Sequence, residues 1–193
     1  GPAQRRSLRR RDGAGAVKAP AADAAVGAPG EDAVESRIRI ARLEPDSPHL
    51  MTLARWELAQ WGHLDPDKRL DQALVSFRAQ CGEAGLPSVF VAMAGDAPVG
   101  MASLIDDDMQ DRAELNPWLA SVYVRPEWRG QGIASRLVRR VEQEAREHGI
   151  ATLHLFTPDR QALYCRLGWQ AFEECVYRGE AVTIMRRELG GSA

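Results

Sequence analysis

At 193 residues the chain is long enough for one well-packed α/β domain and too short for two. Hydrophobic residues make up 45% of it, charged residues 27%, and the formal net charge is −2, values ordinary for a soluble globular protein. No apolar run approaches the roughly 20 residues that cross a bilayer, and no secretory signal is recognised, so we expect a cytoplasmic protein without a membrane partner.

The cysteines and histidines give no sign of a metal site or a disulfide framework. Three cysteines are an odd number, none is spaced as CxxC, and the four histidines lack ligand spacing. We therefore expect a reducing compartment and no metal.

The charge is unevenly distributed. Residues 1–18 carry six basic residues against one acid, a charge of +5, which leaves −7 for the other 175 residues. A mildly acidic body does not indicate a nucleic-acid surface, so no nucleic-acid partner is expected. Two interpretations of the basic segment stay open: a solvated tail, which we favour, and an adaptor that recruits nucleic acid or another partner.

Composition predicts the domain boundaries. Residues 1–36 are rich in Ala, Gly and Pro and lack aromatics, so they are expected to form a disordered tail, with Gly1-Pro2 a cloning remnant. The predicted domain covers 37–189, and 190–193 form a second tail. The oligomeric state is left open between monomer and homodimer.

The first half of the domain is predicted to hold one strand, two helices and a hairpin. Residues 37–43 alternate polar and apolar side chains, as a half-buried strand does. Helices are expected over 48–61 and 66–82, the second with Asp65 as its N-cap and Pro66 at its first position. Strands over 88–94 and 99–105 flank a Gly-Asp-Ala-Pro turn.

The second half alternates strands and helices. An acidic stretch over 106–114 precedes a strand at 118–124, and a long amphipathic helix opens after Gly132 and ends near Gly149. A strand over 152–156, a short helix over 159–167 and a hairpin of 169–177 with 181–187 follow. This order predicts a mixed α/β sheet of about seven strands with about four helices.

The most informative segment is the glycine-bearing turn between the strand at 118–124 and the long helix. The first amides of a helix lack intrahelical partners and point outward, and the macrodipole makes that end attractive to anions. Gly130 and Gly132 would let these amides approach a phosphate without a Cβ in the way. Arg129 and Arg136 could add positive charge to the same anion. The turn is neither a Walker loop nor a full GxGxxG, and by itself it could be no more than a turn.

Two motifs resemble those of one family. Arg129-x-x-Gly132-x-Ala134 is similar to the Q/R-x-x-G-x-G/A signature of the GNAT superfamily of acetyl-CoA-dependent N-acetyltransferases. Residues 163–169, Leu-Tyr-Cys-Arg-Leu-Gly-Trp, resemble that family's L-Y-x-x-x-G-F/W element. The order of strands and helices over 37–189 fits as well.

The resemblance implies where acetyl-CoA binds as co-substrate. In this family the strand before the signature splays from its parallel neighbour and its backbone holds the pantetheine arm, while the pyrophosphate lies on the amides of the signature loop. The residues implied for cofactor binding here are Val122, Tyr123, Val124, Arg129, Gly130, Gln131, Gly132, Ile133, Ala134 and Ser135. Many members carry Asn where this chain has Thr157, so Thr157 departs from the pattern.

The resemblance also implies a catalytic residue. Tyr164 matches the common general acid, which donates a proton to the departing thiolate, although a packing tyrosine is the alternative. The general base stays open between a water chain and one of six acidic residues, and His154 is expected to be a packed histidine. These acidic candidates are Asp106, Asp107, Asp108, Glu114, Glu173 and Glu174.

The predicted function is transfer of the acetyl group to a primary amine by direct attack, without an acyl-enzyme. The acidic stretch before the strand at 118–124 would attract a cationic small-molecule amine, and Asp106, Asp107, Asp108 and Trp118 are candidate substrate contacts. A solvated loop is the alternative for that stretch. A non-catalytic acyl-CoA sensor and an acetyltransferase of protein or peptide N-termini remain alternative functions.

Overall fold

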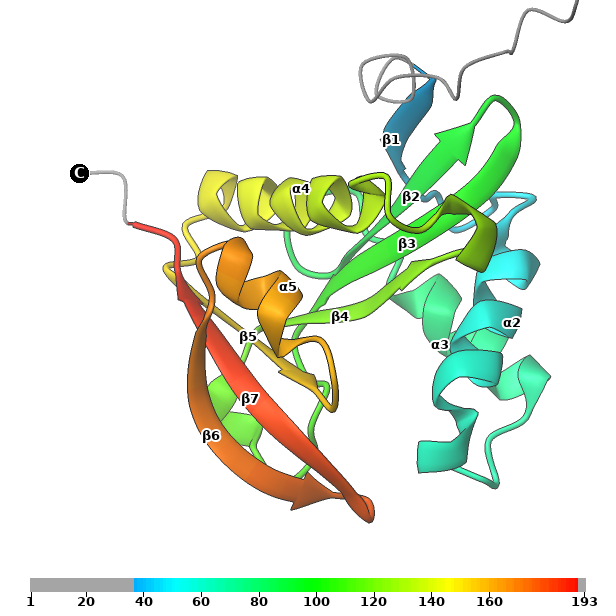
Figure 1. Ribbon diagram of the computed structural model, residues 1–193. Coiled ribbons are helices and arrows are strands. Elements are labelled where there is room, and N and C mark those ends of the chain that lie inside the picture. The colour runs from blue at the N-terminus through cyan, green and yellow to red at the C-terminus, as the bar shows by residue number, and fades with distance from the viewer. Residues whose placement is uncertain (1–36, 191–193) are drawn as a thin grey trace, which may run out of the picture.

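The structure, a computed structural model, describes residues 37–190 (Figure 1). The tails predicted over 1–36 and at the C-terminal end, apart from Gly190, lie outside the described residues. The described strands are β1 (Ile38–Arg42), β2 (Ser88–Ala94), β3 (Ala97–Ile105), β4 (Trp118–Val124), β5 (Thr152–Thr157), β6 (Gln170–Tyr177) and β7 (Glu180–Glu188). The described α-helices are α2 (Leu50–Trp61), α3 (Leu70–Ala79), α4 (Ile133–Glu147) and α5 (Gln161–Arg166).

All seven strands form one sheet in the order β1-β2-β3-β4-β5-β7-β6. Neighbouring strands are antiparallel except β4 and β5, which are parallel. The predicted mixed sheet is confirmed, and the strand boundaries fall within two residues of those expected from hydrophobic alternation. Gly149 adopts a left-handed φ of 75° directly after α4, as expected at a helix end.

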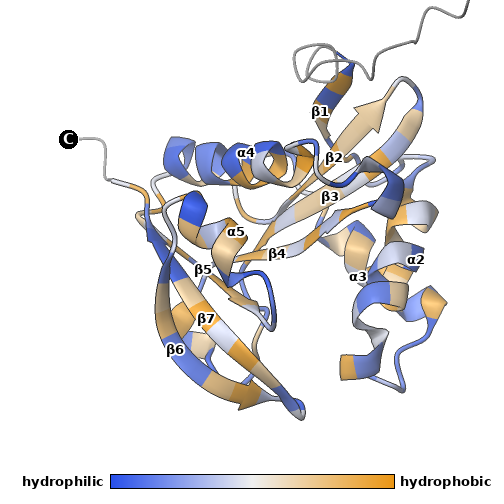
Figure 2. Ribbon diagram, in the orientation of Figure 1, coloured by the Kyte–Doolittle hydropathy of each residue, from blue (hydrophilic) through white to orange (hydrophobic). Residues whose placement is uncertain are grey.

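Helices cover both faces of the sheet, which explains the continuous apolar sequence of β2. Phe90 and Ala92 belong to the core beneath α4, whereas Val89, Val91 and Met93 pack with α2 and α3 on the opposite face. Successive residues of a strand point to opposite faces, so a strand with helices on both sides has no polar face. Figure 2 shows α4 with a hydrophilic outer face and apolar residues toward the sheet.

The parallel pair separates soon after it forms. Trp118 and His154 are the paired positions of β4 and β5, and His154 N–H donates to the carbonyl of Pro117 at 3.1 Å. Beyond this point the strands diverge (Figure 1). The divergence opens a cleft in the middle of the sheet, and it leaves the β5-facing edge of β4 without a partner strand over most of its length.

The predicted start of the second helix is wrong. The expected N-cap was Asp65, but α3 begins at Leu70, where the Arg69 N–H donates to the Gln72 side chain at 2.9 Å. Residues 62–64 instead form a 3-10 turn that the β6–β7 hairpin contacts, with the Arg178 guanidinium donating to the Leu64 carbonyl at 2.8 Å. This contact between distant parts of the chain outweighs the local Asp-Pro signal.

Candidate active site

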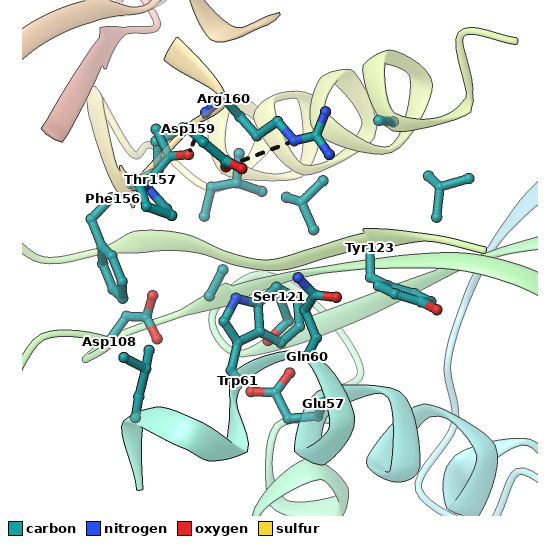
Figure 3. A pocket seen from close by; sticks show the side chains of 18 of the residues that line it. Glu57, Gln60, Trp61, Asp108, Ser121, Tyr123, Phe156, Thr157, Asp159 and Arg160 are labelled. Carbon is teal, nitrogen blue, oxygen red and sulfur yellow. Dashed lines mark hydrogen bonds and ion pairs between the residues drawn. The ribbon is translucent and has the colours of Figure 1, made fainter. Parts of the chain in front are cut away.

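A cleft of about 950 Å³ lies where β4 and β5 separate (Figure 3). Its walls come from seven parts of the chain: α2 with the turn after it, α3, the loop after β3, β4 with the loop that leads into α4, the end of β5, α5, and the tip of the β6–β7 hairpin. Segments from both halves of the sequence therefore meet at one site.

The turn before α4 has the geometry of an anion-binding loop. Gly130 and Gly132 adopt left-handed φ angles of 75° and 78°, which L-residues with a Cβ adopt only at a cost. A Cβ built at either glycine would meet no atom of residues 37–190 within 4 Å, so the space above both is open in this part of the chain. Within the same residues no side chain caps the N-terminus of α4, which leaves its first amides available to a ligand.

The two arginines near this turn have different positions. Arg129 lines the cleft, and its Nε donates to the Val124 carbonyl at 2.8 Å, which fixes the turn against the end of β4. Arg136 lies outside the lining, and its guanidinium donates to the Ile38 carbonyl of β1 at 2.9 Å. The hypothesis that both would serve one anion is therefore not supported for Arg136, because its guanidinium is held by β1.

The middle of β4 is distorted on the cleft side. The pairing with β3 shifts between Met101↔Tyr123 and Ser103↔Ala120, so two residues of β4 face one of β3. Ser121 lies in this bulge with a φ of 53°, a left-handed conformation uncommon outside glycine. Bulges redirect the backbone and its side chains. This bulge faces the cleft at a point between the anion-binding turn and the loop after β3.

Of the other residues implied for cofactor binding, all but Gln131 line the cleft. Val122, Tyr123 and Val124 line the cleft from β4, and Ile133, Ala134 and Ser135 line it from the first turn of α4. Gln131 is exposed and is not part of the lining.

Tyr164 lies on α5 and lines the cleft while being largely buried, with 7% of its surface exposed. Its ring packs edge-to-face against Trp169, with centroids 6.1 Å apart. Burial raises the pKa of Tyr164 to about 12, so the phenol carries its proton at neutral pH. A protonated hydroxyl at this position could donate a proton to a group in the cleft.

The acidic stretch after β3 contributes only part of its charge to the cleft. Asp107 and Asp108 line it, whereas Asp106 is exposed and lies outside the lining. Burial, together with the nearby negative charges of Glu57 and Asp107 and against the opposing charge of Lys68, raises the pKa of Asp108 to about 7. Because Ile105 pairs with Trp118, this loop lies at the opposite end of β4 from the anion-binding turn.

Several candidates from the sequence lie elsewhere. Trp118 is fully buried in the core beneath the β4–β5 junction and lines no part of the cleft. His154 packs beside it, with ring centroids 5.8 Å apart, as expected of a packed histidine. Glu173 pairs with Arg112 at 2.7 Å outside the cleft.

Glu114 and Glu174 are exposed and likewise lie outside the lining. Thr157 lines the cleft, but its hydroxyl accepts a hydrogen bond of 3.0 Å from the Arg160 N–H and so shapes the start of α5.

Glu57 is a site residue that the sequence analysis missed. It lies on α2 and lines the cleft, and its Oε2 is shielded from solvent without a hydrogen-bond partner among residues 37–190. One signal was available: Glu57 follows Leu53 by four residues and precedes Trp61 by four, so a carboxylate interrupts the apolar face of the helix.

Comparison with known proteins fits this geometry. The acetyltransferase (GNAT) family model matches residues 50–169, which include α2, the anion-binding turn and Tyr164. The chain belongs to the GNAT acetyltransferase family. The prediction of a GNAT-type enzyme is thereby confirmed at the level of the family.

Curated relatives include the thialysine N-epsilon-acetyltransferases of Bos taurus and Sus scrofa, at 36% and 35% identity. Each match covers 39% of this chain and 48% of the relative. The chain thus spans about half the length of the curated relatives it matches.

Solved structures share the fold. YncA of Salmonella typhimurium, determined with its cofactor acetyl-CoA, superposes with a TM-score of 0.60 at 20% identity over 81% of this chain and 96% of its own. A GNAT-family protein of Desulfovibrio desulfuricans gives a TM-score of 0.60 at 21% identity, over 79% and 99%.

Two further observations concern the GNAT domain as described. None of the helices within 37–190 is long and apolar enough to cross a membrane. Over the same residues, no group of three or more His, Cys, Asp or Glu side chains could hold a metal ion.

Proposed function

We propose that this GNAT domain transfers the acetyl group of acetyl-CoA to a primary amine on a cationic small molecule. The observation that carries the proposal is the distribution of charge along the cleft, which is positive at one end of β4 and negative at the other. Free helix amides and Arg129 lie beyond one end of the strand, and Asp107 and Asp108 lie beyond the other. A ligand with phosphates at one end and a cationic acceptor at the other would match this charge distribution.

The residues at the anion-binding end fit acetyl-CoA. The open space above Gly130 and Gly132 is a cradle that any side chain would fill, and the uncapped amides of α4 suit a pyrophosphate. When bound, acetyl-CoA supplies a thioester whose carbonyl carbon is open to attack. The unpaired edge of β4 offers backbone groups to the rest of the molecule, and YncA, a protein of the same fold, binds acetyl-CoA.

Direct attack is favoured over a cysteinyl acyl-enzyme because no cysteine of residues 37–190 lies at the cleft. All three cysteines lie within the described residues, and none lines the cleft. Cys81 is buried and donates to the Phe77 carbonyl at 3.3 Å, and burial raises its pKa to about 11, which keeps the thiol protonated. Tyr164 would then donate its proton to the leaving sulfur.

Two observations support a cationic amine as the acceptor: the negative charge of the loop after β3 and the names of the curated relatives. The thialysine enzymes are named for acetylating an epsilon amine, and such a group is cationic at neutral pH. Asp107 and Asp108 would attract it before the attacking nitrogen loses its proton.

A pair of amines of equal length tests this proposal. 1,4-Diaminobutane and n-butylamine differ in one positive charge, and we expect acetyl transfer to the diamine to be the faster and the more weakened by salt. The double substitution Asp107→Asn with Asp108→Asn should raise the KM of the doubly charged diamine severalfold, raise that of singly charged butylamine less, and leave the Kd of acetyl-CoA unchanged. An equal response of both amines would exclude charge selection at this loop.

The same assay separates the alternative functions. Preferential acetylation of a peptide with a free N-terminus would indicate an N-terminal acetyltransferase. Tight binding of acetyl-CoA by calorimetry, without turnover of any amine or peptide, would indicate an acyl-CoA sensor instead.

A further inference from the structure

Glu57 presents a buried acceptor atom that the fold leaves unused. Its Oε2 is inaccessible to solvent and has no hydrogen-bond partner among residues 37–190, although the side chain lines the cleft. A buried carboxylate oxygen without a partner costs free energy, because the hydration it loses is not replaced. Such an atom at the wall of a cleft is well suited to a ligand that donates a hydrogen bond or carries positive charge.

The position of Glu57 along the cleft is set by β4. Trp56, the preceding residue, packs its ring on that of Tyr123 with centroids 5.1 Å apart, which holds α2 against the strand. The Ser121 side chain, which lies in the bulge, acts on the Glu57 carboxyl and favours its charged form. Glu57 therefore faces the middle of β4, between the anion-binding turn and the acidic loop.

The charged groups around Glu57 come from the segments packed against α2. Asp108, from the loop after β3, interacts electrostatically with Glu57, and Asp107 lines the same part of the cleft. Lys68, from the turn before α3, is the positive group that acts on Glu57 and Asp108. Burial is the main cause that raises the pKa of the Glu57 carboxyl, while Ser121 and Lys68 act in the opposite direction.

We propose that Glu57 is the general base of the acetyl transfer. This inference rests on the proposed function. The acceptor ammonium gives one proton to Oε2 of Glu57, and the neutral nitrogen then attacks the thioester carbonyl carbon. A carbon–nitrogen bond forms, the carbon–sulfur bond breaks, and the departing sulfur takes the proton of Tyr164. The second proton of the nitrogen leaves to solvent, and the Glu57 proton returns to the tyrosinate through solvent.

The position of Glu57 favours it over the aspartates for this role. It lies beside the bulge in mid-strand, where the two halves of a ligand spanning the cleft would meet, whereas Asp107 and Asp108 lie in the loop at the far end of β4. Burial raises the pKa of Glu57 and so makes it a stronger base than an ordinary exposed carboxylate, a property that it shares with Asp108, so position is what separates the two.

The test uses Glu57→Gln, which keeps the shape of the side chain and removes its basicity. With 1,4-diaminobutane, kcat/KM should fall by about 100-fold or more, the lower range for a general base. O-methylhydroxylamine is uncharged at neutral pH and needs no deprotonation before attack, so its kcat/KM should stay within about threefold of wild type. Exposed Glu83, which lies outside the cleft, supplies the matched control Glu83→Gln, and this variant should behave as wild type with both amines.

Each outcome decides the inference. Unchanged turnover of the diamine by Glu57→Gln would overturn the base role and leave the proposed function standing. Equal losses with both amines would also overturn it and would assign Glu57 to binding or to the fold. A wild-type protein that acetylates neither amine would overturn the proposed function and this role with it.

The wild-type protein provides a test that does not depend on the folding of the variant. The kcat/KM of the diamine should fall as the pH is lowered through the ionisation of Glu57, whereas that of the uncharged amine should not. Parallel profiles for the two amines would overturn the base role.

Discussion

The indole Nε1 of Trp169 donates a 2.9 Å hydrogen bond to the carboxylate of Glu142. Both residues are buried, with 2% and 3% of their surface exposed, although one precedes β6 and the other lies on α4. Tyr164 packs edge-to-face against the ring of the same tryptophan, Trp169. The bond therefore ties α4, which follows the anion-binding turn, to the segment between α5 and β6 on which Tyr164 packs.

We expect Glu142→Ala to destabilise the protein by about 1–3 kcal/mol, because it leaves the buried indole N–H without an acceptor. Glu142→Gln keeps an acceptor oxygen and should cost less. Glu147→Ala, at an exposed position of the same helix, should change the free energy of unfolding by no more than about 0.5 kcal/mol. Urea denaturation measures all three, and similar values for Glu142→Ala and Glu147→Ala would contradict the assigned role of the bond.

Replacing Gly132 by Ala should weaken acetyl-CoA binding by about tenfold or more, because a Cβ would occupy the cradle above the loop. The left-handed φ adds a cost of about 1 kcal/mol to folding. Gly95 is the matched control: it has a φ of 60° and equally open surroundings, but it lies in the β2–β3 turn outside the cleft. Calorimetry should show that Gly95→Ala binds acetyl-CoA with unchanged affinity. An equal loss of acetyl-CoA affinity in both variants would point to backbone strain as the cause, and not to the filled cradle.

Tyr164→Phe removes one hydroxyl and retains the ring that packs on Trp169. If Tyr164 is the proton donor, kcat should fall by about 10- to 1000-fold while the Kd of acetyl-CoA changes little. Steady-state kinetics and calorimetry together check this prediction. A comparable loss in cofactor affinity would assign the residue to binding or packing.

Asp108 should make stability depend on pH. Its pKa rises from the usual 3.8 to about 7 in the folded state, so the folded form binds more protons than the unfolded form between these values. Stability is therefore lost as the pH rises from about 4 to about 7. Asp108→Asn should remove this loss and be more stable than wild type by about 1–3 kcal/mol at pH 8, with a smaller gain at pH 5. An equal difference at both pH values in urea denaturation would contradict the raised pKa.

Features that depend on a short stretch of chain were predictable from the sequence. The turn over 129–135 is one, because left-handed glycines and the free amides of an amphipathic helix are properties of neighbouring residues. The strands were predictable because burial on one or both faces leaves an alternating or continuous apolar pattern. Tyr164 was identified from its resemblance to a motif, and the structure places it in the cleft wall.

Only the tertiary structure decided which acidic residues line the cleft between the middle of β4 and the loop after β3. Glu57, Asp108 and Ser121 come from a helix, a loop and a strand far apart in sequence, and their pairing depends on how α2 packs on β4. The bulge at Ser121 is a mismatch between two strands, so neither strand reveals it alone. Desolvation of a carboxylate likewise depends on the groups that surround it in the fold. Asp106 and Asp108 look alike in the sequence, but Asp106 is exposed and Asp108 lines the cleft.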